Sequence, residues 1–191
     1  MCPVEQAWEK ADQAGSFKQS PVRAYLCKMK GGRCSDLPSV SISGLLVTAA
    51  GSIAGIGLVG ALSAYYSLPL LFPSFGATAV LLYAACHVPM AQPRNVIGGH
   101  LISALMGVLT YHFLGGQWWS VTLGVTLAIL AMIITRTLHP PGGATAFVAV
   151  FNGQGFGFIV SPVGIGVLCL VFIAVLVNNL SSERRYPDYW W

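Results

Sequence analysis

Long apolar stretches, separated by short polar or proline-containing segments, make up most of this chain. The first apolar stretch runs over 42–66, and three others run over 96–114, 121–137 and 162–180. At a rise of about 1.5 Å per residue, helices of this length approach the roughly 30 Å thickness of a bilayer core. These four stretches therefore predict membrane-spanning helices.

Two further apolar stretches are broken by proline and glycine. The first covers 68–87 and contains Pro69 and Pro73, and the second begins with HPPGGATA at 139–146. Proline lacks an N–H group and restricts the residue before it, so it interrupts a helix or begins one. We expect the first stretch to be extended to about residue 74 and helical to about 85, and the second to be helical up to residue 151.

The two broken stretches resemble each other. PSFGATAV at 73–80 and PPGGATAF at 140–147 share five of eight residues at an offset of 143 − 76 = 67 residues. Each copy lies between two apolar stretches, so each unit holds three segments. This order predicts an all-α membrane protein with about six transmembrane segments, arranged as a 3+3 inverted repeat with two Pro/Gly-broken half-helices. The alternative is four spans plus two re-entrant helices.

The distribution of basic residues favours the first topology. Six crossings would place the basic residues on one side of the membrane. These are the basic residues of the N-terminal segment and Arg94, Arg136, Arg184 and Arg185. Basic residues concentrate on the cytoplasmic side of membrane proteins. With four crossings, Arg94 and Arg136 would move to the other side.

Charge is scarce within the apolar region and has one sign. Charged residues make up 8% of the chain, and residues 41–182 contain no Asp or Glu and only Arg94 and Arg136 as Lys or Arg. Proteins that move cations or protons usually keep an intramembrane carboxylate. If this protein moves a charged solute, we therefore expect an anion. The alternative is an apolar membrane body that moves no charged solute.

The starts of the two broken helices are the candidate anion site. A helix N-terminus presents unpaired N–H groups and a partial positive charge, which in membrane transporters can face an anionic substrate. Hydroxyl groups could add donors or bond to their own helix. An arginine could attract the anion or lie at the lipid interface, and a histidine could titrate or play a structural part. The candidate substrate-binding residues are Ser74, Phe75, Gly76, Ala77, Thr78, His100, Arg136, His139, Gly142, Gly143, Ala144 and Thr145.

The remaining expectations concern the ends of the chain and its surroundings. Residues 1–40 form a polar segment that we expect to be cytoplasmic, with either a surface helix or a solvated stretch at 21–30; residues 41–182 form the membrane domain, and 183–191 a tail. No secretory signal is recognisable, and the cysteines show no metal spacing. We expect a bacterial inner-membrane protein with both termini cytoplasmic, in contact with lipid, and without cofactor, metal or nucleic acid. Its small-residue faces are compatible with a homo-oligomer.

Two motifs resemble a known family. AQPRNVIGGH at 91–100 and TRTLHPPGGATA at 135–146 resemble the two signatures of the HPP family of integral membrane proteins, and the likeness extends over about 68–191, including NNL at 178–180 and RYP at 185–187. Members in plastids and cyanobacteria are associated with nitrite transport. The resemblance thus implies nitrite as the substrate, and it supplies no ligand residues for this chain.

Together these observations predict a transporter or channel for a small monovalent anion, nitrite first and nitrate second. The alternatives are a transporter of formate, another weak acid or a neutral solute, and a membrane scaffold that transports nothing. We do not expect an enzyme, because the sequence offers no nucleophile–base pair, metal spacing or intramembrane carboxylate.

Overall fold

The computed structural model describes residue 29 and residues 41–66 and 70–191. Contacts divide the chain into residues 1–39 and 40–191, and the second unit is described here by itself. Apart from Met29, the predicted surface helix at 21–30 lies outside the described residues.

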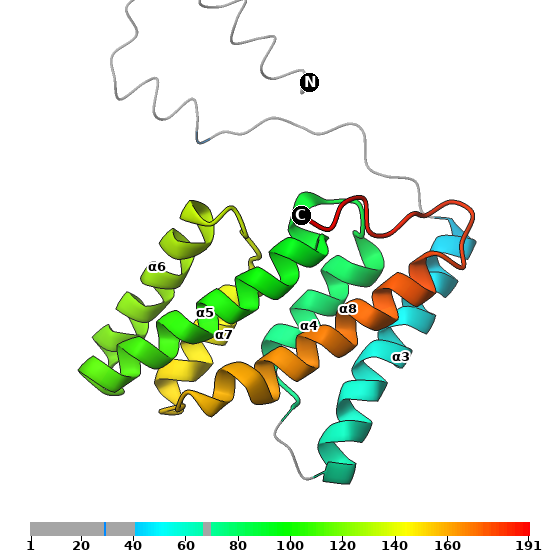
Figure 1. Cartoon of the computed structure of the whole chain (residues 1–191). Coiled ribbons are helices and arrows are strands. Elements are labelled where there is room, and N and C mark those ends of the chain that lie inside the picture. The colour runs from blue at the N-terminus through cyan, green and yellow to red at the C-terminus, as the bar shows by residue number, and fades with distance from the viewer. Residues whose placement is uncertain (1–28, 30–40, 67–69) are drawn as a thin grey trace, which may run out of the picture. The chain divides into compact units, whose positions relative to one another are not determined.

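The described residues contain six α-helices and no strand (Figure 1). Three helical stretches, Ile42–Tyr66, Pro93–Leu114 and Ile159–Asn178, are long and apolar enough to cross a membrane, and three apolar ones are shorter. The described part of the chain is therefore all-helical, and its long apolar helices are those of a membrane protein. The helices are α3 (Ile42–Tyr66), α4 (Pro73–Ala79), α5 (Pro93–Leu114), α6 (Trp118–Ile134), α7 (Pro141–Phe151) and α8 (Ile165–Asn178), with π-helical turns η1 (Val80–Ala84) after α4 and η3 (Ile159–Gly164) before α8, and the 3₁₀ turn η2 (Pro89–Ala91) before α5.

Proline begins three of these helices. Pro73, Pro93 and Pro141 are the first residues of α4, α5 and α7. A proline at this position loses no helical hydrogen bond, because the first N–H groups of a helix have no partner within it. The predicted starts of α4 and α5 were therefore two to three residues too late. Asn95 has a residue type that is common at helix caps, but its side chain donates to the carbonyl of Leu138 at 3.0 Å.

Helix α6 ends in a left-handed turn just before the HPP motif. Arg136 has φ of 56°, its N–H donates to the carbonyl of Ile133, and the N–H of Thr137 donates to that of Met132. This pair of bonds defines a Schellman motif, in which glycine is the usual left-handed residue. The turn ends the helix at Ile134. The sequence had predicted an end three residues later, at residue 137.

Arg184 gathers three helix ends at one end of the helical body. Its guanidinium donates to the carbonyls of Tyr83 at 2.7 Å and Gly44 at 2.9 Å. It also donates to the hydroxyl of Thr48 at 3.1 Å and to the amide oxygen of Asn178 at 3.2 Å. The start of α3, the end of η1 and the end of α8 therefore meet at this arginine.

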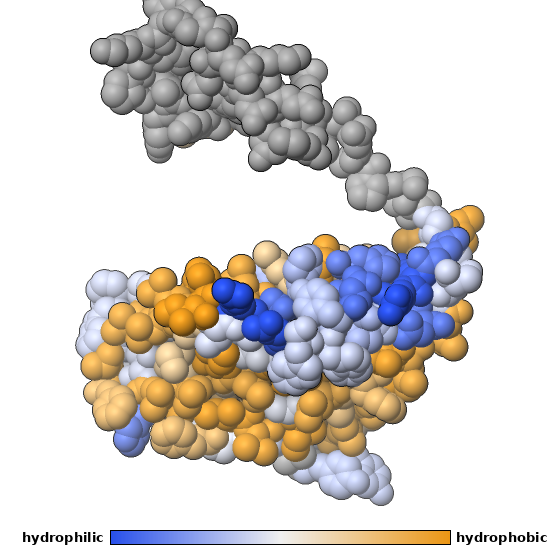
Figure 2. Space-filling view, turned by 45° about the horizontal axis from the view of Figure 1, so that its top comes forward, coloured by the Kyte–Doolittle hydropathy of each residue, from blue (hydrophilic) through white to orange (hydrophobic). Residues whose placement is uncertain are grey.

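The start of α5 and the end of α6 lie at the same end. Arg94 donates to the carbonyl of Thr135 at 3.3 Å, and the buried Tyr186 donates from its hydroxyl to the carbonyl of Ala91 at 2.8 Å. We call this region, formed by residues 42–48, 83–95, 134–138 and 178–191, the charged end. Hydrophilic atoms gather along it, beside a mostly hydrophobic surface (Figure 2).

Close packing at glycines sets the distances between the central helices. Helix α5 packs against α6, α7 and α8. A Cβ built on Gly107 of α5 would lie 2.6 Å from the Cβ of Ala149 on α7, and one on Gly142 would lie 3.0 Å from the carbonyl oxygen of Gly99. Small residues permit such approach of helices in a membrane, where packing drives association.

Candidate functional site

The two broken helices lie side by side near their starts. The hydroxyl of Thr145 on α7 donates to the hydroxyl of Ser74 on α4 at 3.2 Å. About one turn further along α4, the hydroxyl of Thr78 lies 3.0 Å from Nε2 of His139, which precedes α7. The contact partner of Thr78, the later residue on α4, is therefore the earlier residue of the second segment. Helices α4 and α7 therefore run antiparallel, with their first turns overlapping rather than meeting end to end.

His100 of α5 joins these two helices. Its Nε2 lies 2.8 Å from the hydroxyl of Thr78, and its Nδ1 lies 2.8 Å from the hydroxyl of Thr145. The rings of His100 and His139 are 4.8 Å apart between centroids. Thr78 and Thr145 occupy equivalent positions of the two repeated motifs, so the repeat supplies both hydroxyls that hold His100.

We call Ser74, Thr78, His100, His139 and Thr145 the histidine–threonine cluster. Each of these five side chains is at most 1% exposed. Buried polar groups within a membrane are costly, and those that occur there generally serve function or pairing. The cluster is therefore the strongest candidate for a functional site in the described part of the chain.

An apolar shell surrounds the cluster. Phe75 packs edge-on against the ring of His100 with centroids 5.6 Å apart, and Phe72 contacts both Phe75 and Phe158. The sulfur of Met132 on α6 lies close to Gly99 and Gly142, which adjoin the cluster in the sequence or in space. The cluster thus lies within the packed interior and has no charged side chain among its hydrogen-bond partners.

A backbone carbonyl fixes the orientation of one histidine. Nδ1 of His139 lies 2.8 Å from the carbonyl oxygen of Met90 in η2, at the charged end. A carbonyl oxygen only accepts, so Nδ1 carries the hydrogen and Nε2 faces Thr78. No feature of the sequence pointed to Met90, because any residue can supply a carbonyl.

The predicted backbone donors occupy varied environments. The N–H groups of Phe75, Gly142 and Gly143 donate to carbonyls of the preceding turn, those of Phe72, His139 and Pro140 respectively. In this structure these three groups therefore take part in starting their helices. Of the predicted residues, Phe75 and Gly142 are buried, Gly143 is half-buried, and Gly76, Ala77 and Ala144 are exposed.

Arg136 lies apart from the cluster. It is exposed and occupies the left-handed turn after α6, at the charged end. The structure therefore brings together five of the twelve predicted site residues and leaves this arginine at the rim.

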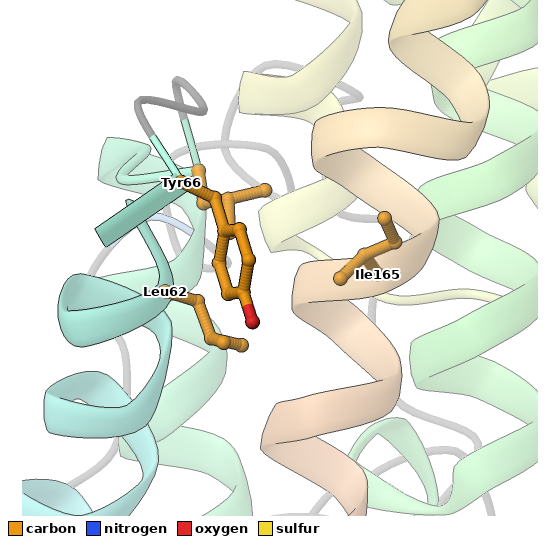
Figure 3. Close-up of a pocket in the computed structure, with 4 residues that line it drawn as sticks. Leu62, Tyr66 and Ile165 are labelled. Atoms are coloured by element: carbon orange, nitrogen blue, oxygen red, sulfur yellow. The ribbon is translucent and has the colours of Figure 1, made fainter. Parts of the chain in front are cut away.

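A separate pocket has a different character. It has a volume of about 280 Å³ and lies between α3 and α8, lined by Leu62, Tyr66, Leu70 and Ile165 (Figure 3). An apolar lining of this kind offers little to an inorganic anion, which requires hydrogen-bond donors or positive charge. The pocket therefore does not extend the candidate site.

Comparisons with known proteins agree with the fold and the motifs. The model of the HPP transmembrane region matches residues 37–187. Two relatives from Dictyostelium discoideum, both described only as transmembrane proteins, are 40% identical over 129 residues and 39% identical over 132 residues.

These matches cover 63% and 65% of this chain but 42% and 46% of the relatives, so the chain spans less than half the length of the curated relatives that it matches. No solved structure matches the chain. Because the family model covers most of the sequence, including both broken helices and the histidine–threonine cluster, the chain belongs to the HPP family of transmembrane proteins.

Proposed function

We propose that this protein carries a small monovalent anion across a membrane, with nitrite as the first substrate and nitrate as the second. The observation that supports this proposal best is the buried histidine–threonine cluster, at the place where two broken helices overlap inside an apolar body. Transporters often place their substrate sites at broken helices near the middle of the membrane.

The chemistry of the surrounding region favours an anion over a cation. Residues 41–182 contain no carboxylate that could bind a cation, whereas the cluster offers hydroxyl and imidazole N–H groups, which donate hydrogen bonds. The membership in the HPP family adds the expectation of nitrite, which the residues alone do not supply.

An inverted repeat is part of this proposal. The offset of 67 residues relates Gly99 to Gly166 and Phe75 to Gly142. A Cβ on Gly142 would lie 3.0 Å from the carbonyl oxygen of Gly99, and one on Gly166 would lie 2.2 Å from the ring of Phe75. The two close contacts are therefore equivalent under the repeat. The packing of α6 against α5 is likewise equivalent to the packing of α3 against α8. These paired contacts support two three-helix units of opposite orientation.

The charged end suggests the orientation in the membrane. Arg94, Arg136, Arg184 and Arg185 lie within it, as does the start of α3. By the positive-inside rule this end faces the cytoplasm, together with both termini. The relatives come from a eukaryote, so a location in a bacterial inner membrane rests on the sequence expectation alone.

The test is uptake of nitrite into liposomes that contain the purified full-length protein, with nitrate, formate and chloride as competitors. Two variants assign the route. Gly143→Leu adds a side chain on α7, two residues before Thr145, at a position where a Cβ meets nothing within 4 Å. Gly57→Leu adds the same side chain in similarly open space on α3 and is the matched control.

We expect saturable uptake above protein-free liposomes, at least a tenfold loss in Gly143→Leu and normal uptake in Gly57→Leu. Absence of uptake by folded unmodified protein would reject the transport proposal. Normal uptake in Gly143→Leu would remove α7 from the route while keeping transport.

A further inference from the structure

The hydroxyl of Thr78 has more hydrogen-bond partners than it has protons to share. It lies 2.9 Å from the carbonyl oxygen of Ser74, 2.8 Å from Nε2 of His100 and 3.0 Å from Nε2 of His139. A threonine hydroxyl has one hydrogen to donate and two lone pairs that accept. The proton positions on the two histidines therefore decide whether these contacts can all be made.

The hydrogen-bond partners of the two Nδ1 atoms determine where these protons lie. Nδ1 of His139 donates to the carbonyl of Met90, so a neutral His139 has no hydrogen on Nε2. Thr145 donates its hydrogen to Ser74, so at its 2.8 Å contact with His100 it accepts, and Nδ1 of His100 carries the hydrogen. A neutral His100 then also has no hydrogen on Nε2. Two bare ring nitrogens thus face one hydroxyl hydrogen.

One added proton reduces the shortage of donors at Thr78. If a proton binds Nε2 of either histidine, that ring donates to the oxygen of Thr78. The hydroxyl hydrogen of Thr78, which is donated to the carbonyl of Ser74, can then turn to the other ring, because an α-helical carbonyl also accepts from the N–H four residues further on. Without the added proton, one buried ring nitrogen has no donor, which is unfavourable. The position for this proton is shared by His100 and His139, on opposite sides of Thr78.

The added proton needs a negative charge beside it, because burial disfavours a charged imidazole. The side chains against the two rings, from α4, α5 and α7, supply hydroxyls and the ring of Phe75 but no carboxylate. The neighbouring ionisable groups are engaged elsewhere, since Arg94 donates to Thr135 and Tyr83 donates to Leu170. The other ionisable residues on the elements around the rings are Tyr111, His112, Arg136 and Cys169, and none of them is an Asp or a Glu.

We propose that the histidine–threonine cluster binds one proton together with one transported anion. This inference rests on the proposed transport function and specifies its coupling. A proton from one solution forms an N–H bond at Nε2, the anion offsets its charge, and both leave to the other solution as that N–H bond breaks. No net charge crosses the membrane. Binding of each partner strengthens binding of the other by the same factor.

The experiment measures nitrate and nitrite uptake into liposomes while the pH gradient and the membrane voltage are set independently. Nitrate is the decisive probe because its conjugate acid is strong, so little anion leaks across as the neutral acid. We expect uptake to increase as the outer pH falls, to acidify the interior by one proton per anion, and to be insensitive to voltage.

The possible failures are distinct. Uptake of neither anion rejects the transport proposal itself. Uptake that follows voltage and ignores the pH gradient keeps the transport proposal and overturns proton coupling.

Three threonine variants test the role of the hydroxyl. Thr78→Val removes the hydroxyl and keeps the shape, and we expect it to lose the pH dependence and at least tenfold in rate. Thr78→Ser retains the hydroxyl and should keep the pH dependence. Thr110→Val is the matched control, because Thr110 is buried and bonds only its own helix, at the carbonyl of Met106. Retained pH dependence in folded Thr78→Val would overturn the proposal.

A measurement on the unmodified protein avoids any folding defect of a variant. Nitrogen NMR of ¹⁵N-labelled histidine distinguishes a ring with one protonated nitrogen from a ring with two. We expect saturating nitrate to produce one doubly protonated buried ring at a pH where the anion-free protein has two neutral ones. Two neutral rings in the presence of nitrate at every pH that supports uptake would overturn the proposal.

Discussion

Two polar centres hold this helical body together, and they differ in what can change. At the charged end, Arg184 donates to two carbonyls, a hydroxyl and an amide oxygen. In the histidine–threonine cluster, five neutral side chains share hydroxyl and imidazole protons. An arginine keeps its charge at any physiological pH, whereas a buried imidazole can gain a proton when a negative charge lies beside it. The first centre is therefore a fixed clamp, and the second can respond to its surroundings.

The residues near each centre reinforce this difference. Burial raises the pKa of the Tyr186 hydroxyl at the charged end, which keeps it protonated as a donor to Ala91. In these contacts Arg184 and Tyr186 can only donate, because the carbonyls of Tyr83, Gly44 and Ala91 only accept. The cluster instead has two ring nitrogens facing one hydroxyl at Thr78, and its hydrogen bonds depend on how many protons are present. We therefore expect mutations at the charged end to act on stability and mutations in the cluster to act on transport.

The largest expected effect on stability is that of Arg184→Met. The change leaves the carbonyls of Tyr83 and Gly44 without this donor and disconnects the ends of α3, η1 and α8. We expect a loss of about 1.5–3 kcal/mol in the free energy of unfolding, the range for hydrogen bonds to a charged group. Unfolding in detergent micelles, followed by circular dichroism, measures it.

Arg185→Met is the matched control, because Arg185 is an exposed neighbour, and surface substitutions usually change stability by less than about 0.5 kcal/mol. Equal stabilities of the two variants would contradict the assignment of Arg184 as the clamp. Loss of pH-dependent uptake in folded Arg184→Met would contradict the separate roles, because the charged end would then act on transport as well as on stability.

The next effect separates two adjacent glycines of the HPP motif. A Cβ on Gly142 would lie 2.6 Å from the hydroxyl of Ser103, whereas one on Gly143 would meet nothing within 4 Å. We expect Gly142→Ala to destabilise by about 1–3 kcal/mol through overpacking. Gly143→Ala should be neutral or stabilise by up to about 1 kcal/mol, because alanine favours a helix. Thermal unfolding of both variants compares them, and a larger loss at Gly143 would contradict the packing described here.

The sequence predicted helical segments well where a proline or a glycine bounds them, as at Pro73, Pro141 and Gly115. It placed α3 at 42–66, where the structure has it, and located both breaks. It misplaced the start of α5 because Asn95 has the residue type of a cap, although its side chain reaches Leu138 in another segment. A contact between distant segments leaves no local pattern.

The candidate site was predicted in part for the same reason. The repeated threonines, Thr78 and Thr145, identified two of the five cluster residues, since the repeat is visible in the sequence. The sequence also named His100 and His139 but assigned no contact between them. Their meeting at Thr78 depends on how α4, α5 and α7 pack, and the Met90 carbonyl has no signature at all. The sequence thus predicted which side chains take part. The number of donors and acceptors that meet at Thr78 follows from how the helices pack.

The smallest expected effect tests whether the rim of the charged end contributes to transport. Arg136 is exposed at the end of α6 and lies outside the cluster. Arg136→Gln removes its charge and leaves the cluster intact, so we expect unchanged stability and an unchanged maximal rate. If the charge concentrates anions near the mouth, the nitrate concentration for half-maximal uptake should rise about twofold at low salt. The difference should vanish at high salt, because exposed charges are screened over about 10 Å at 0.1 M.

Arg136→Lys keeps the charge and is the control for the side chain itself. A shift in both variants would assign the effect to the guanidinium rather than to its charge. No shift in Arg136→Gln at low salt would leave Arg136 with a structural or lipid-facing role. A change in the pH dependence would be the most informative failure, because the fixed charge of the rim would then act on the protons shared by His100 and His139, and the charged end would be coupled to the cluster.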